Sequence, residues 1–131
     1  MSTLSVYLYV PNLIGYVRVV TGLMALAYAF QPGAYLSFFF LYGFSYALDA
    51  VDGVAARALG QASKFGAVLD MVTDRFCTAA LLAVLAHVYQ AHPPSWVPAD
   101  AAPWVPVGAI VLAVLDIASH WVQMYSCVPR T

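Results

Sequence analysis

Long apolar segments separated by short polar or Pro-rich connections dominate the hydrophobic pattern of the chain. Four such segments cover residues 13–30, 33–48, about 65–89 and about 104–128. Only Arg18 interrupts the first segment, and the second reaches a full span only if it continues through Asp49 and Asp52. At about 1.5 Å per helical residue, the first segment reaches about 27 Å, close to the roughly 30 Å of a bilayer core. The pattern therefore predicts an all-α fold, a polytopic transmembrane bundle of four helices.

The composition agrees with lipid as the solvent for most of the surface. Of the 131 residues, 63% are hydrophobic and 8% are charged, whereas soluble domains have roughly 45–50% and about 25%. The formal net charge is −1, so the chain lacks the strongly basic character that indicates nucleic-acid binding. We therefore expect a single transmembrane domain over residues 1–131, with membrane lipid and no nucleic acid among its partners.

Basic residues divide unequally between the two sides of the predicted bundle. If the four helices alternate in direction, every Lys and Arg falls on one side: Arg18, Arg57, Lys64, Arg75 and Arg130. The connections on the opposite side, residues 31–33 and 91–103, contain neither Lys nor Arg. The positive-inside rule assigns the basic side to the cytosol. We therefore expect both chain ends in the cytosol and the connection 91–103 in the lumen.

Four aspartates form a candidate metal site at the cytosolic side. Asp49 and Asp52 are three positions apart and Asp70 and Asp74 are four apart, so each pair shares one face of its helix. Neighbouring carboxylates at a membrane boundary are costly to desolvate and repel one another. A hard divalent cation removes this cost, because Mg²⁺, Mn²⁺ and Ca²⁺ prefer carboxylate oxygens. Two such ions would balance four carboxylates and suit displacement at phosphorus.

The alternative interpretation of the aspartates is a solvated helix end. Asp is common at the start of a helix, which could explain Asp70. It does not explain Asp49 and Asp52, which are expected at a helix C-terminus, where the macrodipole disfavours anions. The metal site is therefore the preferred interpretation.

A longer motif contains these aspartates. It reads Asp49-x-x-Asp52-Gly53-x-x-Ala56-Arg57 and, after eight residues, Gly66-x-x-x-Asp70-x-x-x-Asp74. This motif resembles the signature of the CDP-alcohol phosphatidyltransferase family. The segments 10–18, 55–59, 65–71 and 115–121 are similar to the eukaryotic inositol branch of that family.

The resemblance implies an enzyme that transfers the phosphatidyl group of CDP-diacylglycerol to myo-inositol, giving phosphatidylinositol and CMP. It implies Mg²⁺ or Mn²⁺, with two ions bound by Asp49, Asp52, Asp70 and Asp74. Asp74 would also be the catalytic base that accepts the proton of the inositol hydroxyl. Gly53, Arg57 and Ser63 would contact the CDP-diacylglycerol. The resemblance further implies the endoplasmic reticulum membrane, a cytosol-facing site and a homodimer in full-length members.

Alternatives remain open at this point. The acceptor could be another alcohol, such as glycerol phosphate, serine or choline. Family members usually have six transmembrane helices, so a chain with four is expected to be C-terminally incomplete, and a truncated inactive form is possible. A non-enzymatic membrane protein that binds divalent cations is a third alternative. A transporter would be expected to hold its carboxylates near the bilayer midplane, whereas these are predicted at helix ends beside a basic loop.

Two further features of the sequence concern polar residues in the later helices. Asp116 and His120 are four apart on the fourth predicted helix, where they are expected to form a polar pair that steadies helix packing. Arg75 is expected to extend its guanidinium towards the membrane boundary while its aliphatic stem stays in lipid.

Overall fold

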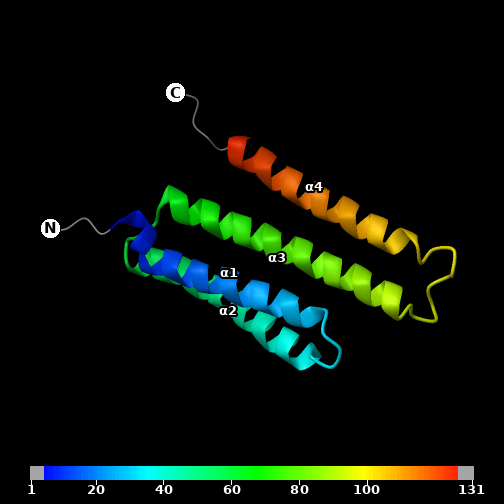
Figure 1. Cartoon of the computed structure of the whole chain (residues 1–131). Coiled ribbons are helices and arrows are strands. Elements are labelled where there is room, and N and C mark those ends of the chain that lie inside the picture. Colours follow the sequence, from blue (N-terminus) through cyan, green and yellow to red (C-terminus); the bar gives the residue numbers. More distant parts are fainter. Residues whose placement is uncertain (1–4, 127–131) are drawn as a thin grey trace. The chain divides into compact units, whose positions relative to one another are not determined.

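The computed structural model describes residues 5–126, and over that range the chain is helical (Figure 1). It contains a short 3₁₀ helix, η1 (Val6–Leu8), followed by α1 (Val10–Ala29), α2 (Tyr35–Ala58), α3 (Lys64–Ala91) and α4 (Trp104–Ser126). No strand occurs between residues 5 and 126. The prediction of an all-α fold with four helices is confirmed. The predicted end of the fourth helix at residue 128 and the basic residue Arg130 lie outside the described residues.

The helix α2 continues through its aspartates, as a full span requires. It ends in a turn around Gly60, whose φ of +62° is a left-handed conformation that glycine adopts without steric cost. The N–H of Gly60 donates to the carbonyl of Arg57 at 3.4 Å, and the N–H of Gln61 donates to that of Ala56 at 3.0 Å. This pair of bonds is a Schellman motif, which ends the helix and reverses the chain.

The turn after α2 also fixes the start of α1. The side-chain Oε1 of Gln61 accepts a hydrogen bond of 2.9 Å from the N–H of Val10, the first residue of α1. Pro11 follows at the beginning of that helix, where its missing N–H costs no helical hydrogen bond. Local chemistry at both ends therefore holds the start of α1 beside the end of α2.

Several polar side chains are buried and many large apolar side chains are exposed, which is the reverse of the usual pattern in a soluble protein. The buried polar residues are Asn12, Arg18, Ser45, Asp52 and Thr73, and Asn12 and Thr73 are the largest fully buried side chains. On α2, by contrast, Leu36, Phe40 and Tyr46 are each at least 74% exposed. Apolar residues that face lipid lose nothing by this exposure, and helices in lipid pack through small and polar residues. The arrangement is that of a membrane protein.

Two of the helices are candidates for crossing a membrane. By length and composition alone, α1 and α4 are long and apolar enough to span a bilayer. The helix α2 carries two aspartates and one arginine in its second half, and α3 carries charged residues in its first half. The polar residues of these two helices therefore gather towards the loop that joins them.

The chain forms two compact units, residues 1–74 and 75–131. In the first unit, α1 packs along α2, and its polar side chains also reach the beginning of α3. The second unit holds the rest of α3 and all of α4. All the predicted site residues belong to the first unit: Asp49, Asp52, Gly53, Arg57, Ser63, Asp70 and Asp74.

Candidate active site

Four carboxylates converge on one buried guanidinium. Asp49 and Asp52 come from α2 and Asp70 and Asp74 from α3, and all four contact Arg18 of α1. The Arg18 Nη1 atom lies 2.8 Å from Asp52 Oδ2 and 2.6 Å from Asp70 Oδ1. The Nη2 atom lies 2.5 Å from Asp49 Oδ1 and 2.7 Å from Asp74 Oδ1. The two aspartate pairs of the predicted metal site are therefore brought together around one side chain.

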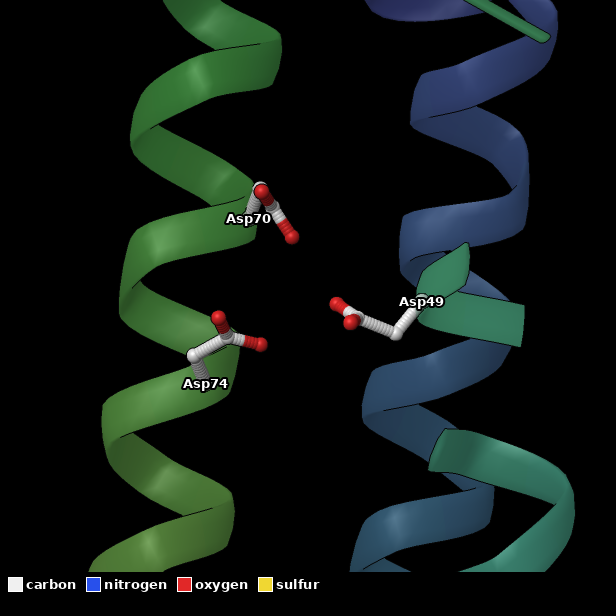
Figure 2. A group of neighbouring side chains, drawn as sticks. All are labelled: Asp49, Asp70 and Asp74. Atoms are coloured by element: carbon white, nitrogen blue, oxygen red, sulfur yellow. The ribbon is translucent and has the colours of Figure 1, made fainter. Parts of the chain in front are cut away.

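Three of the aspartates have a geometry that fits a metal ion. Asp49, Asp70 and Asp74 each offer one oxygen, and these three oxygens lie within 4.8 Å of one another. Figure 2 shows the three carboxyl groups pointing towards one another from α2 and α3. Carboxylate oxygens are the ligands that Mg²⁺ and Mn²⁺ prefer. The residues therefore fit a divalent cation.

Asp52 differs from the other three aspartates. Its side chain is 10% exposed, whereas those of Asp49 and Asp74 are 36% exposed and that of Asp70 is 49% exposed. Its carboxylate is directed at Arg18, and the metal-compatible group of three does not include it. Of the four predicted ligands, three thus share an accessible site and the fourth is buried behind them.

The structure corrects the helix-end argument for the aspartates. The helix α2 continues beyond Asp52 to Ala58, and α3 begins six residues before Asp70, at Lys64. The helix macrodipole acts within the last turn, so it does not decide the placement of Asp49 and Asp52. Asp70 is not an N-terminal cap either, because no acidic residue lies in the first turn of α3. The carboxylates are instead held together by their common contact with Arg18.

Sequence reasoning missed the role of Arg18. Its side chain is only 3% exposed, although it was expected to be one of several basic residues on the cytosolic side. The hydroxyl of Ser45 donates to the backbone carbonyl of Arg18 at 3.1 Å, which ties this part of α1 to α2. One signal was present, because Arg18 is the single charged residue in an otherwise apolar segment. Such a residue usually has a charged partner or a function.

A cleft of about 230 Å³ adjoins the aspartates. Gly53, Arg57 and Ser63, the residues predicted to contact the donor, all line it, and Asp52 and Asp70 line it as well. The remaining lining residues are Pro11, Asn12, Gly15, Ala56, Gln61, Ala62, Gly66, Ala67 and Leu69. The structure therefore brings the non-aspartate part of the motif into one cavity that shares two side chains with the carboxylate cluster.

The floor of the cleft is fixed by hydrogen bonds around Gly66. Ser63 caps α3, because its Oγ accepts the N–H of Gly66 at 3.0 Å. The Nδ2 of Asn12 donates to the carbonyl of Val6 at 2.7 Å, which fixes the orientation of the Asn12 amide. A Cβ added at Gly66 would lie 2.7 Å from Asn12 Oδ1. Glycine at position 66 thus permits the close approach of α1 and α3.

A second polar cluster lies in the other unit. Arg75 Nη1 contacts Asp116 Oδ1 on α4 at 2.6 Å. The guanidinium of Arg75 therefore has an ionic partner within the protein, in addition to the position near the membrane boundary that was expected. The Nδ1 of His120 lies 2.8 Å from the backbone carbonyl of Asp116 and 3.7 Å from its carboxylate. Asp116 and His120 are therefore neighbours, as expected, but the charged partner of Asp116 is Arg75.

Comparison with known proteins adds to this geometry. The sequence model of the family described as CDP-alcohol phosphatidyltransferase matches residues 8–130 of the chain. The chain belongs to the CDP-alcohol phosphatidyltransferase family. This membership agrees with the motif, with the outward-facing apolar helices and with two helices that can span a membrane.

Several relatives within the CDP-alcohol phosphatidyltransferase family are named CDP-diacylglycerol–inositol 3-phosphatidyltransferase. The one numbered 1 in Arabidopsis thaliana is 50% identical over 123 residues, covering 94% of this chain and 47% of the relative. The Homo sapiens protein is 40% identical over 126 residues, covering 96% and 52% respectively. The Saccharomyces cerevisiae protein is 42% identical over 118 residues, covering 90% and 47%. The chain thus spans about half the length of the curated relatives it matches.

The comparison with solved structures gave no match for this chain.

Proposed function

We propose that this family member transfers the phosphatidyl group of CDP-diacylglycerol to myo-inositol, forming phosphatidylinositol and releasing CMP. The observation that carries the proposal is the convergence of Asp49, Asp70 and Asp74 beside the cleft lined by Gly53 and Arg57. The choice of inositol is supported by the names of the relatives, which are 40–50% identical over most of this chain.

In this proposal the aspartates hold Mg²⁺ or Mn²⁺, with two ions in the complete site. Asp49, Asp70 and Asp74 would be ligands through the three oxygens that already lie together, and Asp52 would be the fourth. Bound divalent ions supply positive charge that stabilises the phosphate oxygens during displacement at phosphorus. The aspartates fix where that charge is placed relative to the cleft.

Arg57, Gly53 and Ser63 would bind the phosphate-bearing part of the donor. The guanidinium of Arg57 lies next to Gly53, since a Cβ added at Gly53 would be 3.6 Å from Arg57 Nη1. An arginine offers a planar set of donors that matches phosphate oxygens, and glycine lets a ligand approach the backbone closely. Ser63 accepts a backbone hydrogen bond through its oxygen, and its O–H can donate to the donor lipid.

Asp74 would be the catalytic base. Its carboxylate is partly exposed, so it can accept a proton from the attacking hydroxyl of inositol. The inositol oxygen then forms the new bond to the phosphorus of the phosphatidyl group. The bond from that phosphorus to the CMP oxygen breaks, and CMP leaves with the electron pair. Asp74 returns its proton to solvent before the next cycle.

The proposed site faces the cytosol from the endoplasmic reticulum membrane. Among the described residues, Arg57 and Lys64 flank the loop between α2 and α3, and the connection 91–103 contains no Lys or Arg. Arg18 and Arg75 bind aspartates, so they contribute less to the orientation than Arg57 and Lys64. In full-length relatives the same unit would be part of a homodimer.

An acceptor panel tests the proposal. The purified chain is supplied with CDP-diacylglycerol, Mn²⁺ or Mg²⁺ and one of four labelled alcohols: myo-inositol, glycerol 3-phosphate, serine or choline. We expect labelled lipid only with myo-inositol. Labelled lipid formed with another alcohol would show that this alcohol, and not inositol, is the acceptor. Mn²⁺ binding without any lipid product would indicate a truncated inactive form or a non-enzymatic cation-binding protein.

A further inference from the structure

The guanidinium of Arg18 lies where the carboxylates of the cluster converge. Both of its terminal nitrogens are used, and each contacts one aspartate of α2 and one of α3. Its Nε atom is buried and has no hydrogen-bond partner among the described residues. Both terminal nitrogens of Arg18 are therefore bound by carboxylates, whereas its Nε–H donor is unsatisfied.

The charge of the cluster is far from balanced by Arg18. One positive charge faces four negative ones, three of them on side chains that are at least 36% exposed. A buried carboxylate that loses its cationic partner is strongly destabilised. Arg18 thus allows the aspartates to lie close together, yet the remaining negative charge still attracts a further cation.

Arg18 and a divalent ion would bind the same three carboxylate groups. Asp49, Asp70 and Asp74 are the group of three that can hold a metal, and a terminal nitrogen of Arg18 lies within 2.7 Å of an oxygen of each. A Mg²⁺ ion needs oxygen ligands at about 2.0–2.1 Å. An ion bound this closely to the three carboxylates lies beside the guanidinium, and the repulsion between the two cations opposes its binding.

We propose that Arg18 is a built-in counter-cation of the aspartate cluster, which a divalent metal ion displaces, so that Arg18 sets the metal affinity of the site. This inference rests on the metal-binding part of the proposed function. Arg18 acts through the metal ligands and is a positioning residue, not a catalytic one. Arg18 keeps the four aspartates together at low metal concentration. Because its positive charge repels the incoming ion, it also lowers the affinity of the site for the metal ion.

Equilibrium Mn²⁺ binding tests this proposal without any substrate. Free Mn²⁺ is measured by electron paramagnetic resonance during titration of the wild-type chain, Arg18→Gln and Arg18→Lys in detergent. Removing the competing charge should tighten the Mn²⁺ dissociation constant of Arg18→Gln by about tenfold or more. Arg18→Lys keeps one charge but lacks the fork that spans four carboxylates, so its constant should fall between the other two.

Lys64→Gln is the matched control. It removes one positive charge from the same unit, at an exposed position on the first turn of α3, and should change the Mn²⁺ constant less than about twofold because exposed charges are screened. Saturating Mn²⁺ should also raise the thermal midpoint of Arg18→Gln more than that of the wild type, because the ion replaces the missing cation.

The possible results separate the inference from the proposed function. If Arg18→Gln binds Mn²⁺ with unchanged or weaker affinity, Arg18 is an ordinary structural residue and the inference is wrong, while the metal site stands. If no variant and no wild-type protein binds Mn²⁺, the metal site itself is wrong and the inference falls with it. Should Arg18→Gln fail to fold, Arg18→Lys decides: tighter binding than wild type supports displacement, and equal or weaker binding overturns it.

Discussion

The four aspartates share one partner but not one environment. Asp52 is buried against Arg18, whereas Asp49 and Asp74 have partly exposed carboxylates that point into the group shown in Figure 2. Asp74 lies one helical turn further along α3 than Asp70. Equal chemistry at four positions therefore does not imply equal function, and conservative substitutions can separate a metal ligand from a base.

Asp74→Asn should abolish catalysis and preserve donor binding. Asparagine keeps the shape and one oxygen but removes the basicity, so we expect transfer to fall by about 100-fold or more. Asp49→Asn removes a ligand charge and should weaken Mn²⁺ and donor binding together. Binding of CDP-diacylglycerol measured against Mn²⁺ concentration distinguishes the two variants. If Asp74→Asn loses donor affinity as severely as Asp49→Asn, then Asp74 is mainly a ligand and another group is the base.

At the scale of the elements, glycine at position 66 permits the contact between α1 and the start of α3. The start of α3 lies against α1 at Gly66, where Asn12 and the Ser63 hydroxyl leave no space for a side chain. Gly66, Asn12 and Ser63 also line the cleft proposed for the donor. A change in the packing of α1 against α3 at this point would therefore also change the shape of the cleft.

Gly66→Ala should lower stability. The added methyl would meet Asn12 Oδ1 at 2.7 Å and Ser63 Oγ at 3.2 Å, and such overpacking costs about 1–3 kcal/mol. Gly43→Ala on α2 is the control, because an added methyl there meets nothing within 4 Å and should gain up to about 1 kcal/mol from helix propensity. Thermal unfolding in detergent compares the two. Equal midpoints for both variants would contradict the packing at Gly66.

A different contact joins α3 to α4 in the second unit. The pair Arg75–Asp116 is half-buried, and Asp116 Oδ2 has no hydrogen-bond partner in the described part of the chain. Removing Arg75 would leave this carboxylate without its cation, so Arg75→Met should cost more than Asp116→Asn. We expect a coupling energy of about 1 kcal/mol in a double-mutant cycle of unfolding free energies. Strictly additive effects would show that the contact does not stabilise the unit.

The sequence predicted the helices better than it predicted the site. Apolar segments bounded by Pro and Gly define four helices directly, and only the end of α2 at the Gly60 turn lay well beyond the apolar segment. Same-face spacing predicted that each aspartate pair would be presented together. The contact of Arg18 with both pairs depends on how three helices pack, which no local spacing encodes. For the same reason Arg75 could not be assigned to Asp116.

At the scale of the whole molecule, apolar side chains face outward and the buried positions include charged and polar residues. This distribution and the family match agree on a membrane protein. Orientation in the membrane is a separate question, which depends on the unequal distribution of basic residues between the connections. Among the described residues, Arg57 and Lys64 are the basic side chains that mark the loop between α2 and α3 as the proposed cytosolic side.

Cysteine accessibility tests the orientation. In a background without Cys77 and Cys127, Ser95→Cys marks the connection 91–103 and Ala62→Cys marks the loop between α2 and α3. Position 62 is chosen because Ala62 is exposed, whereas replacing the neighbouring Ser63 would remove the hydroxyl that caps α3. In sealed microsomes a membrane-impermeant maleimide should label position 62 from the cytosolic side and leave position 95 unlabelled. Labelling at position 95 before the membrane is opened would reverse the proposed topology.

CMP release is the most direct test of the proposed transfer of the phosphatidyl group to inositol on an aspartate–metal site. The chain is incubated with CDP-diacylglycerol while Mn²⁺ and myo-inositol are varied independently, and CMP and phosphatidylinositol are quantified together. We expect equal amounts of both products, formed only when both additions are present, and none from Asp70→Asn or after chelation. CMP release that does not depend on inositol, or no release at saturating Mn²⁺ and inositol, would contradict the account.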